Sequence, residues 1–60
     1  MKYSVTFYFQ NTVRNYAVES NGPIEALIDA KTSHEKLTFG IKEERFDAVI
    51  RLEIKKMSHL

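Results

Sequence analysis

The sequence predicts an α+β fold, a single ββαβ domain whose three-stranded antiparallel sheet has the strand order 2-1-3 and carries one helix on one face. Three observations predict it: two extended runs alternate apolar and polar residues, a segment begun by a proline has apolar residues at helical spacing, and a third alternating run follows. Sixty residues allow one domain. We expect this domain to span 1–57, with 58–60 as a flexible C-terminal tail.

The first strand, expected over 3–10, is the centre of the sheet. Its aromatic and β-branched residues fall at every second position, and successive side chains of a strand point to opposite faces. Asn11 and Thr12 indicate a two-residue hairpin loop, with Asn11 in a left-handed conformation. If Gln10 pairs with Val13, Phe7 lies opposite Tyr16. The helix-facing side of this hairpin then consists of Tyr3, Val5, Phe7, Phe9, Arg14, Tyr16 and Val18.

The helix is expected from Pro23 to Leu37. Proline suits the first helical position because an N–H there has no partner within the helix, and Gly22 becomes the N-cap, with Asn21 or Ser20 as alternatives. Gly40 ends the helix region. At about 100° per residue, one stripe of the helix faces the sheet. This stripe consists of Ala26, Leu27, Ala30, His34 and Leu37.

A loop and a third strand complete the predicted domain. We expect 38–46 to be a loop in which Ile41 and Phe46 anchor a solvated run of four charged residues, 42–45. The alternation of apolar and polar residues over 47–57 predicts a strand. We expect this strand to run antiparallel beside the first; pairing parallel to the second strand is the weaker option, because antiparallel neighbours are commoner. The open face of the sheet then receives from it Val49, Arg51, Glu53 and Lys55.

Composition argues against several classes of function. The formal net charge is +1, so no strong field steers the chain toward nucleic acid or acidic lipid. The chain has no cysteine, and therefore neither a disulfide nor a thiolate metal site. In a domain of this size, the lack of disulfides favours a reducing cytoplasm. No apolar stretch has the length of a membrane span.

No residue pattern points to catalysis, a metal or a cofactor. His34 lacks a second ligating group at helical spacing, so we interpret it as a core residue with one ring nitrogen hydrogen-bonded, not as a ligand or general base. Adjacent Glu43 and Glu44 indicate a solvated turn rather than an acid–base pair. Gly22 and Gly40 stand alone, so there is no phosphate loop. We expect no enzyme activity, no cofactor and no bound metal.

The sequence instead indicates a small non-catalytic module for macromolecular interaction, which forms a homodimer and binds a protein partner. Two strand edges and one sheet face are left uncovered in the predicted fold, and proteins normally protect such edges. The candidate interface combines residues of the open face with the shoulder of the helix, Tyr8, Val13, Val49, Ile24 and Ile28. For the two isoleucines, the alternative is packing against Ile41 or Phe46 of the following loop.

Nucleic-acid binding on the open sheet face is the alternative function. An exposed aromatic ring among basic and hydroxyl groups can stack on bases while lysines and arginines contact phosphates. Tyr8 would be the stacking residue, and the candidate phosphate contacts are Arg51, Lys55 and Lys56. Against it, Glu53 lies on the same face, and the chain lacks the strongly basic charge of nucleic-acid-binding domains.

The opening MKYSVTF, followed by a hairpin and a helix that contains Glu25, Ala26 and Leu27, resembles the N-terminal half of HicB-type antitoxin domains. The resemblance covers about half of the chain. The glycine, proline and cysteine features of that family's second strand and loop are absent here. The resemblance therefore assigns no function and no site residue to this chain.

Overall fold

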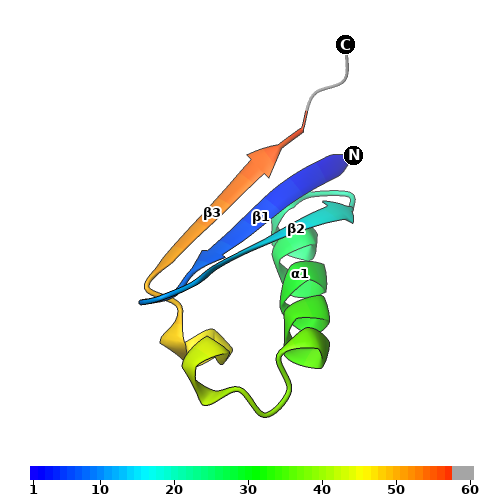
Figure 1. The fold of residues 1–60 in the computed structure, drawn as a ribbon. Coiled ribbons are helices and arrows are strands. Elements are labelled where there is room, and N and C mark those ends of the chain that lie inside the picture. The colour runs from blue at the N-terminus through cyan, green and yellow to red at the C-terminus, as the bar shows by residue number, and fades with distance from the viewer. Residues whose placement is uncertain (58–60) are drawn as a thin grey trace.

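The computed structural model describes residues 1–57 and confirms the predicted fold. A three-stranded antiparallel sheet in the order β2-β1-β3 has α1 packed on one face (Figure 1). The tail predicted for 58–60 lies outside the described residues. The elements are β1 (Lys2–Tyr8), β2 (Val13–Glu19), α1 (Pro23–Leu37), the 3₁₀ turns η1 (Lys42–Glu44) and η2 (Phe46–Ala48), and β3 (Arg51–Lys56).

The predicted pairing of β1 with β2 is wrong by two residues. Val5, not Phe7, lies opposite Tyr16, and Phe7 lies opposite Arg14. A shift of two residues leaves every side chain on its expected face, because the side chains of a strand alternate with a period of two. The set of helix-facing residues is therefore as predicted, although each one has a different neighbour across the strands.

The hairpin loop causes this shift because it begins one residue earlier than predicted. The N–H of Phe9 donates to the carbonyl oxygen of Thr12 at 2.8 Å, so the chain turns at Gln10 and Asn11. Within residues 1–57 no residue other than glycine has a positive φ, so the expected left-handed conformation of Asn11 is also wrong. The earlier turn leaves Phe9 at the end of the buried face, where it is 5% exposed.

Helix α1 begins and ends as the sequence predicts. Pro23 is the first residue and Gly22 the N-cap, which has no side chain to close the helix end. The hydroxyl of Ser20 donates to the carbonyl oxygen of Gly22 at 3.2 Å and fixes the chain just before the helix. After the helix, Gly40 has a φ of 85°, in the left-handed region that favours glycine. Between these two points, α1 packs against all three strands on one face of the sheet (Figure 1).

The buried stripe of α1 differs from the prediction at its C-terminal end. Ala26, Ala30 and His34 are buried and Leu27 packs against the core, but Leu37 is exposed. Thr38 takes the buried position instead. Thr38 follows the side of the helix that carries Lys31 and Glu35 and faces η1 and η2. Leu37 lies on the other side of the buried stripe.

The third strand begins later than predicted. Residues 46–48 form η2, and β3 covers only Arg51–Lys56. Because the 3₁₀ turn interrupts the alternation, Val49 packs against the core and does not lie on the open face, where it was predicted. Ile50 is 71% exposed, and its N–H donates to the carbonyl oxygen of Tyr8 at 2.8 Å.

The core lies between α1 and the helix-facing side of β1. Phe7 and Val5 are fully buried, and two alanines of α1 let the helix approach these side chains closely. The buried hydrophobic residues are Tyr3, Val5, Phe7, Phe9, Ala26 and Ala30. Because this core is small, buried polar groups also contribute to the packing of the helix on the sheet.

Candidate functional site

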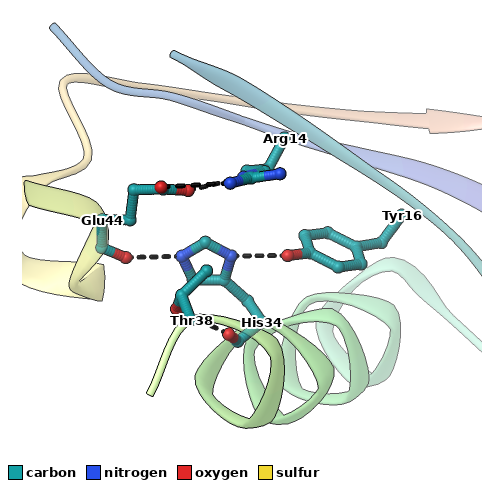
Figure 2. Close-up of polar contacts among 5 residues, drawn as sticks. All are labelled: Arg14, Tyr16, His34, Thr38 and Glu44. Carbon is teal, nitrogen blue, oxygen red and sulfur yellow. Dashed lines mark hydrogen bonds and ion pairs between the residues drawn. The ribbon is translucent and has the colours of Figure 1, made fainter. Parts of the chain in front are cut away.

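His34 lies at the centre of a polar cluster that joins β2, α1 and η1 (Figure 2). Its side chain is fully buried. The ring atom Nδ1 is 2.6 Å from the hydroxyl oxygen of Tyr16, and Nε2 is 2.5 Å from the backbone carbonyl oxygen of Glu44. Both ring nitrogens therefore have a partner, one more than the sequence led us to expect.

The partners of His34 define how the neutral ring is protonated. A carbonyl oxygen only accepts, so Nε2 carries the hydrogen and donates to Glu44. Nδ1 then accepts a hydrogen bond from the hydroxyl of Tyr16. Burial raises the pKa of Tyr16, which keeps this hydroxyl protonated at neutral pH. The arrangement leaves no free lone pair on the imidazole for a metal or for a proton from a substrate.

Aromatic rings enclose the imidazole and exclude water from it. The ring of Phe9 stacks on it at 5.3 Å between centroids with an interplanar angle of 16°. Phe7 meets it edge-on at 5.2 Å, and Tyr16 at 5.6 Å. Hydrogen bonds in such a dry environment are stronger than in water, and an unpaired polar group there is costly. The cluster therefore contributes to holding the layers together.

A charged pair covers the outer side of the cluster. The guanidinium of Arg14 on β2 donates to both carboxylate oxygens of Glu44, with Nε to Oε1 at 2.5 Å and Nη2 to Oε2 at 3.0 Å. This hydrogen bond lowers the pKa of Glu44 and raises that of Arg14. Glu44 therefore does not belong to a solvated charge run as predicted; it is 9% exposed and ties η1 to the sheet.

The end of α1 is fixed by the same histidine. The hydroxyl of Thr38 donates to the backbone carbonyl oxygen of His34 at 2.7 Å, and the Thr38 N–H donates to the same oxygen at 2.9 Å. Among residues 1–57, every buried side-chain nitrogen or oxygen has a hydrogen-bond partner. Because its donors and acceptors are engaged, the cluster has a structural role, and we call it the joint. Its members are Arg14, Tyr16, His34, Thr38 and Glu44.

An open pocket of about 620 Å³ lies beside the joint, between the end of α1 and the two 3₁₀ turns. Phe39, on its rim, is 91% exposed. The ammonium group of Lys31 lies 4.6 Å from the centre of the Phe46 ring, so this cation rests on an aromatic side chain of the pocket lining. The lining also includes Lys42, Arg45, Glu35 and Asp47, so charges of both signs surround the opening. The mixed charge selects neither an anion nor a cation.

On the open face, the predicted residues lie apart. Tyr8 is half-buried, and the guanidinium of Arg51 lies 5.1 Å from its ring centre and covers it. Val13 is exposed at the start of β2, while Val49 lies in the core, so the predicted apolar patch is incomplete. The rest of the face is polar: the amide of Asn15 donates to hydroxyls of β1, those of Ser4 and Thr6.

The predicted nucleic-acid contacts do not form one surface. Arg51 and Lys55 share the open face with Tyr8, whereas Lys56 alternates to the opposite face, where it pairs with Tyr3. Glu53 forms ion pairs with both Arg51, at 3.4 Å, and Lys55, at 3.7 Å. A base would have to displace Arg51 to stack on Tyr8, and a phosphate would have to compete with Glu53. Nucleic-acid binding remains a prediction that this geometry does not favour.

On the helix shoulder, the two predicted isoleucines are free of the loop. Ile24 is 75% and Ile28 58% exposed, and neither belongs to the hydrophobic core cluster. Packing against Ile41 or Phe46, the alternative considered for them, would have buried both side chains. Large exposed side chains on a helix flank are typical of a surface that another molecule covers.

Sequence reasoning missed Glu44 as a partner of the core. One signal was present: Arg14 falls on the apolar face of the hairpin, and a charge there requires an opposite charge. The sequence does not identify which acidic residue it is, because the partner lies 30 positions away in a segment without a periodic pattern.

No protein-family model, curated protein or solved structure matches the chain. Within residues 1–57, no group of three histidine, cysteine or acidic side chains is placed to hold a metal ion. In the same range, none of the helices is both long and apolar enough to cross a membrane.

Replacing Tyr16 with phenylalanine tests the joint. The variant leaves Nδ1 of His34 buried without its partner, and we expect the free energy of unfolding to fall by about 1–3 kcal/mol. Tyr8→Phe is the matched control, because this ring lies on the open face, and it should change the value by less than about 0.5 kcal/mol. Urea unfolding followed by circular dichroism measures both. Equal effects of the two variants would contradict the assigned role of Tyr16.

The lowered pKa of Glu44 predicts a specific dependence of stability on acid. Its folded-state pKa lies below the ordinary value of 4.5, so its contribution is complete above that pH and is lost as the pH falls through the folded-state pKa. Glu44→Gln should therefore lose less stability than the wild-type chain between pH 6 and pH 3. Glu43→Gln, at an exposed neighbour, should follow the wild-type curve. Identical acid profiles for Glu44→Gln and the wild type would disprove the contribution.

Proposed function

We propose that the chain is a non-catalytic interaction module of the cytoplasm that forms a homodimer and binds a protein partner. The observation that carries the proposal is the position of its exposed apolar side chains. Ile24 and Ile28 lie one turn apart on one flank of α1, and Phe39 and Ile41 line the same pocket after α1. Each place is apolar enough to gain from being covered.

The first surface, which we call the α1–β3 flank, consists of the exposed residues Ile24, Ile28 and Leu52. Lys31 identifies the flank, because it contacts Phe46 just before β3 and lies within about 60° of Ile24 and Ile28 around the helix at about 100° per residue. Leu52 lies opposite the buried Phe7 on the helix side of the sheet, yet α1 leaves it 39% exposed. This flank is suited to a second copy of the chain.

The second surface, the α1 loop, consists of Phe39 and Ile41, both exposed. It surrounds Gly40, whose left-handed φ of 85° turns the chain sharply and presents Phe39 outward. The loop borders the 620 Å³ pocket, and it lies at the end of the molecule away from the N-terminus (Figure 1). A single aromatic ring beside a pocket is a common anchor for a protein partner.

The oligomeric state tests the first half of the proposal. Light scattering at micromolar concentration should give twice the 7.0 kDa mass of one chain. Ile24→Glu/Ile28→Glu should be monomeric with an unchanged circular dichroism spectrum, because both side chains are exposed and outside the core. Thr32→Glu/Ser33→Glu adds the same charge elsewhere on α1 and should remain dimeric. A wild-type mass of 7.0 kDa at every concentration would refute the homodimer.

Phe39→Ser tests the second half. With 91% of its surface exposed, Phe39 contributes little to folding, so the variant should keep the wild-type melting temperature and oligomeric state. The amount of partner protein that co-purifies from the native host should fall about tenfold or more, as expected for a lost aromatic anchor. Lys36→Ser, an exposed helix position nearby, is the control and should retain the partner. Equal recovery with both variants would show that the α1 loop is not the contact.

A further inference from the structure

We propose that two copies of the chain associate by pairing the free edges of their β3 strands antiparallel, with the two-fold axis at Leu52, into one six-stranded sheet. The inference rests on the proposed homodimer and specifies its interface. β3 is an edge strand, since the sheet order is β2-β1-β3. An uncovered edge presents unpaired backbone donors and acceptors that another strand can use.

The backbone of β3 has its free groups at the residues that this pairing needs. The N–H of Met57 donates to the carbonyl oxygen of Lys2 at 2.8 Å, so the odd-numbered residues of β3 face β1 with their backbone groups. The even-numbered residues therefore direct their N–H and C=O groups outward, Leu52 among them. A two-fold axis at Leu52 makes this residue and its copy a hydrogen-bonded pair.

The charges of β3 are self-complementary in this register. On the open face, Arg51 of each copy lies opposite Glu53 of the other, which gives two favourable cross-strand pairs. An axis at Arg51 would set arginine against arginine, and an axis at Glu53 would set glutamate against glutamate. An axis at Ile54 would place Leu52 opposite Lys56. Among these axes, only the one at Leu52 gives opposite charges on the open face and apolar pairs on the helix side.

The apolar side chains agree with the charges. On the helix side, Leu52 meets its copy, and Ile54 of each chain lies two residues further along the same face, so the four side chains form an apolar strip. A two-fold axis perpendicular to the sheet keeps both α1 helices on this same face. Ile24 and Ile28 lie on the same flank of α1 as Lys31, which contacts Phe46 shortly before β3, so this flank of each helix would border the new apolar strip. The pairing thus covers the whole α1–β3 flank with one partner, a second copy of the chain.

The other edge of the sheet does not offer the same match. β2 carries only Arg14 and Glu19 as charged residues, and they lie on opposite faces of the strand, so they cannot pair with each other across a two-fold axis. Its outward-facing side chains near the middle are Asn15 and Ala17, which bring neither charge nor large apolar area. The exposed apolar residues of the helix also lie on the side of β3. These observations select β3 over β2.

Cysteine cross-linking tests the pairing directly, because the natural chain has no cysteine. In a hydrogen-bonded antiparallel pair the Cα atoms are about 5.5 Å apart, within the range of a disulfide. Leu52→Cys should therefore form covalent dimers under mild oxidation. Ile54→Cys should not, since its two copies would be about 13 Å apart along the strands. Asn15→Cys reports on the β2 edge and should also stay uncrosslinked.

Charge exchange provides the second measurement. Arg51→Glu should weaken the dimer about tenfold, because two attractive pairs become repulsive, and Glu53→Arg should do the same. The double variant Arg51→Glu/Glu53→Arg should recover the wild-type dissociation constant, as measured by sedimentation. A dimeric chain that cross-links through Ile54→Cys or Asn15→Cys, or shows no recovery, would overturn this interface and leave the homodimer intact. A monomeric chain would overturn both.

Discussion

The fold depends on a buried imidazole that is bonded on both sides. His34 links three segments: Tyr16 reaches it from β2, Glu44 from η1, and the ring itself comes from α1. The six buried hydrophobic residues among positions 1–57 are a small core for a chain without cysteine. In that situation a fully satisfied polar network is worth more than its single bonds, because it determines how the layers are placed relative to one another.

The layered fold could be predicted because it follows from local periodicity. The alternation in β1, the apolar stripe of α1 and the order of the elements favour β3 beside β1 over β3 beside β2, and the structure confirms this topology. The detailed pairing could not be predicted, since a two-residue shift preserves every face and only the loop at Gln10 and Asn11 distinguishes the alternatives. The late start of β3 was hidden for a similar reason: the apolar positions of η2 imitate a strand.

The candidate site was harder to predict than the fold because its parts are far apart in sequence. The bond between Arg14 and Glu44 joins a strand to a 3₁₀ turn 30 residues later, and no spacing rule connects them. By contrast, Ile24 and Ile28 were identified from the helix pattern alone, because they lie beside the core stripe. The same distinction separates the two roles in the molecule: the buried histidine gives the chain its shape, and the exposed isoleucines remain available for a partner.

The protonation of His34 is the most direct test of this account. Nitrogen-15 NMR of the imidazole distinguishes a nitrogen that carries hydrogen from one that accepts a hydrogen bond. At neutral pH we predict a single tautomer with the hydrogen on Nε2 and an unprotonated Nδ1, as required by the carbonyl of Glu44 and the hydroxyl of Tyr16. A hydrogen on Nδ1, or averaged signals typical of a ring in water, would contradict the structure of the joint and the account built on it.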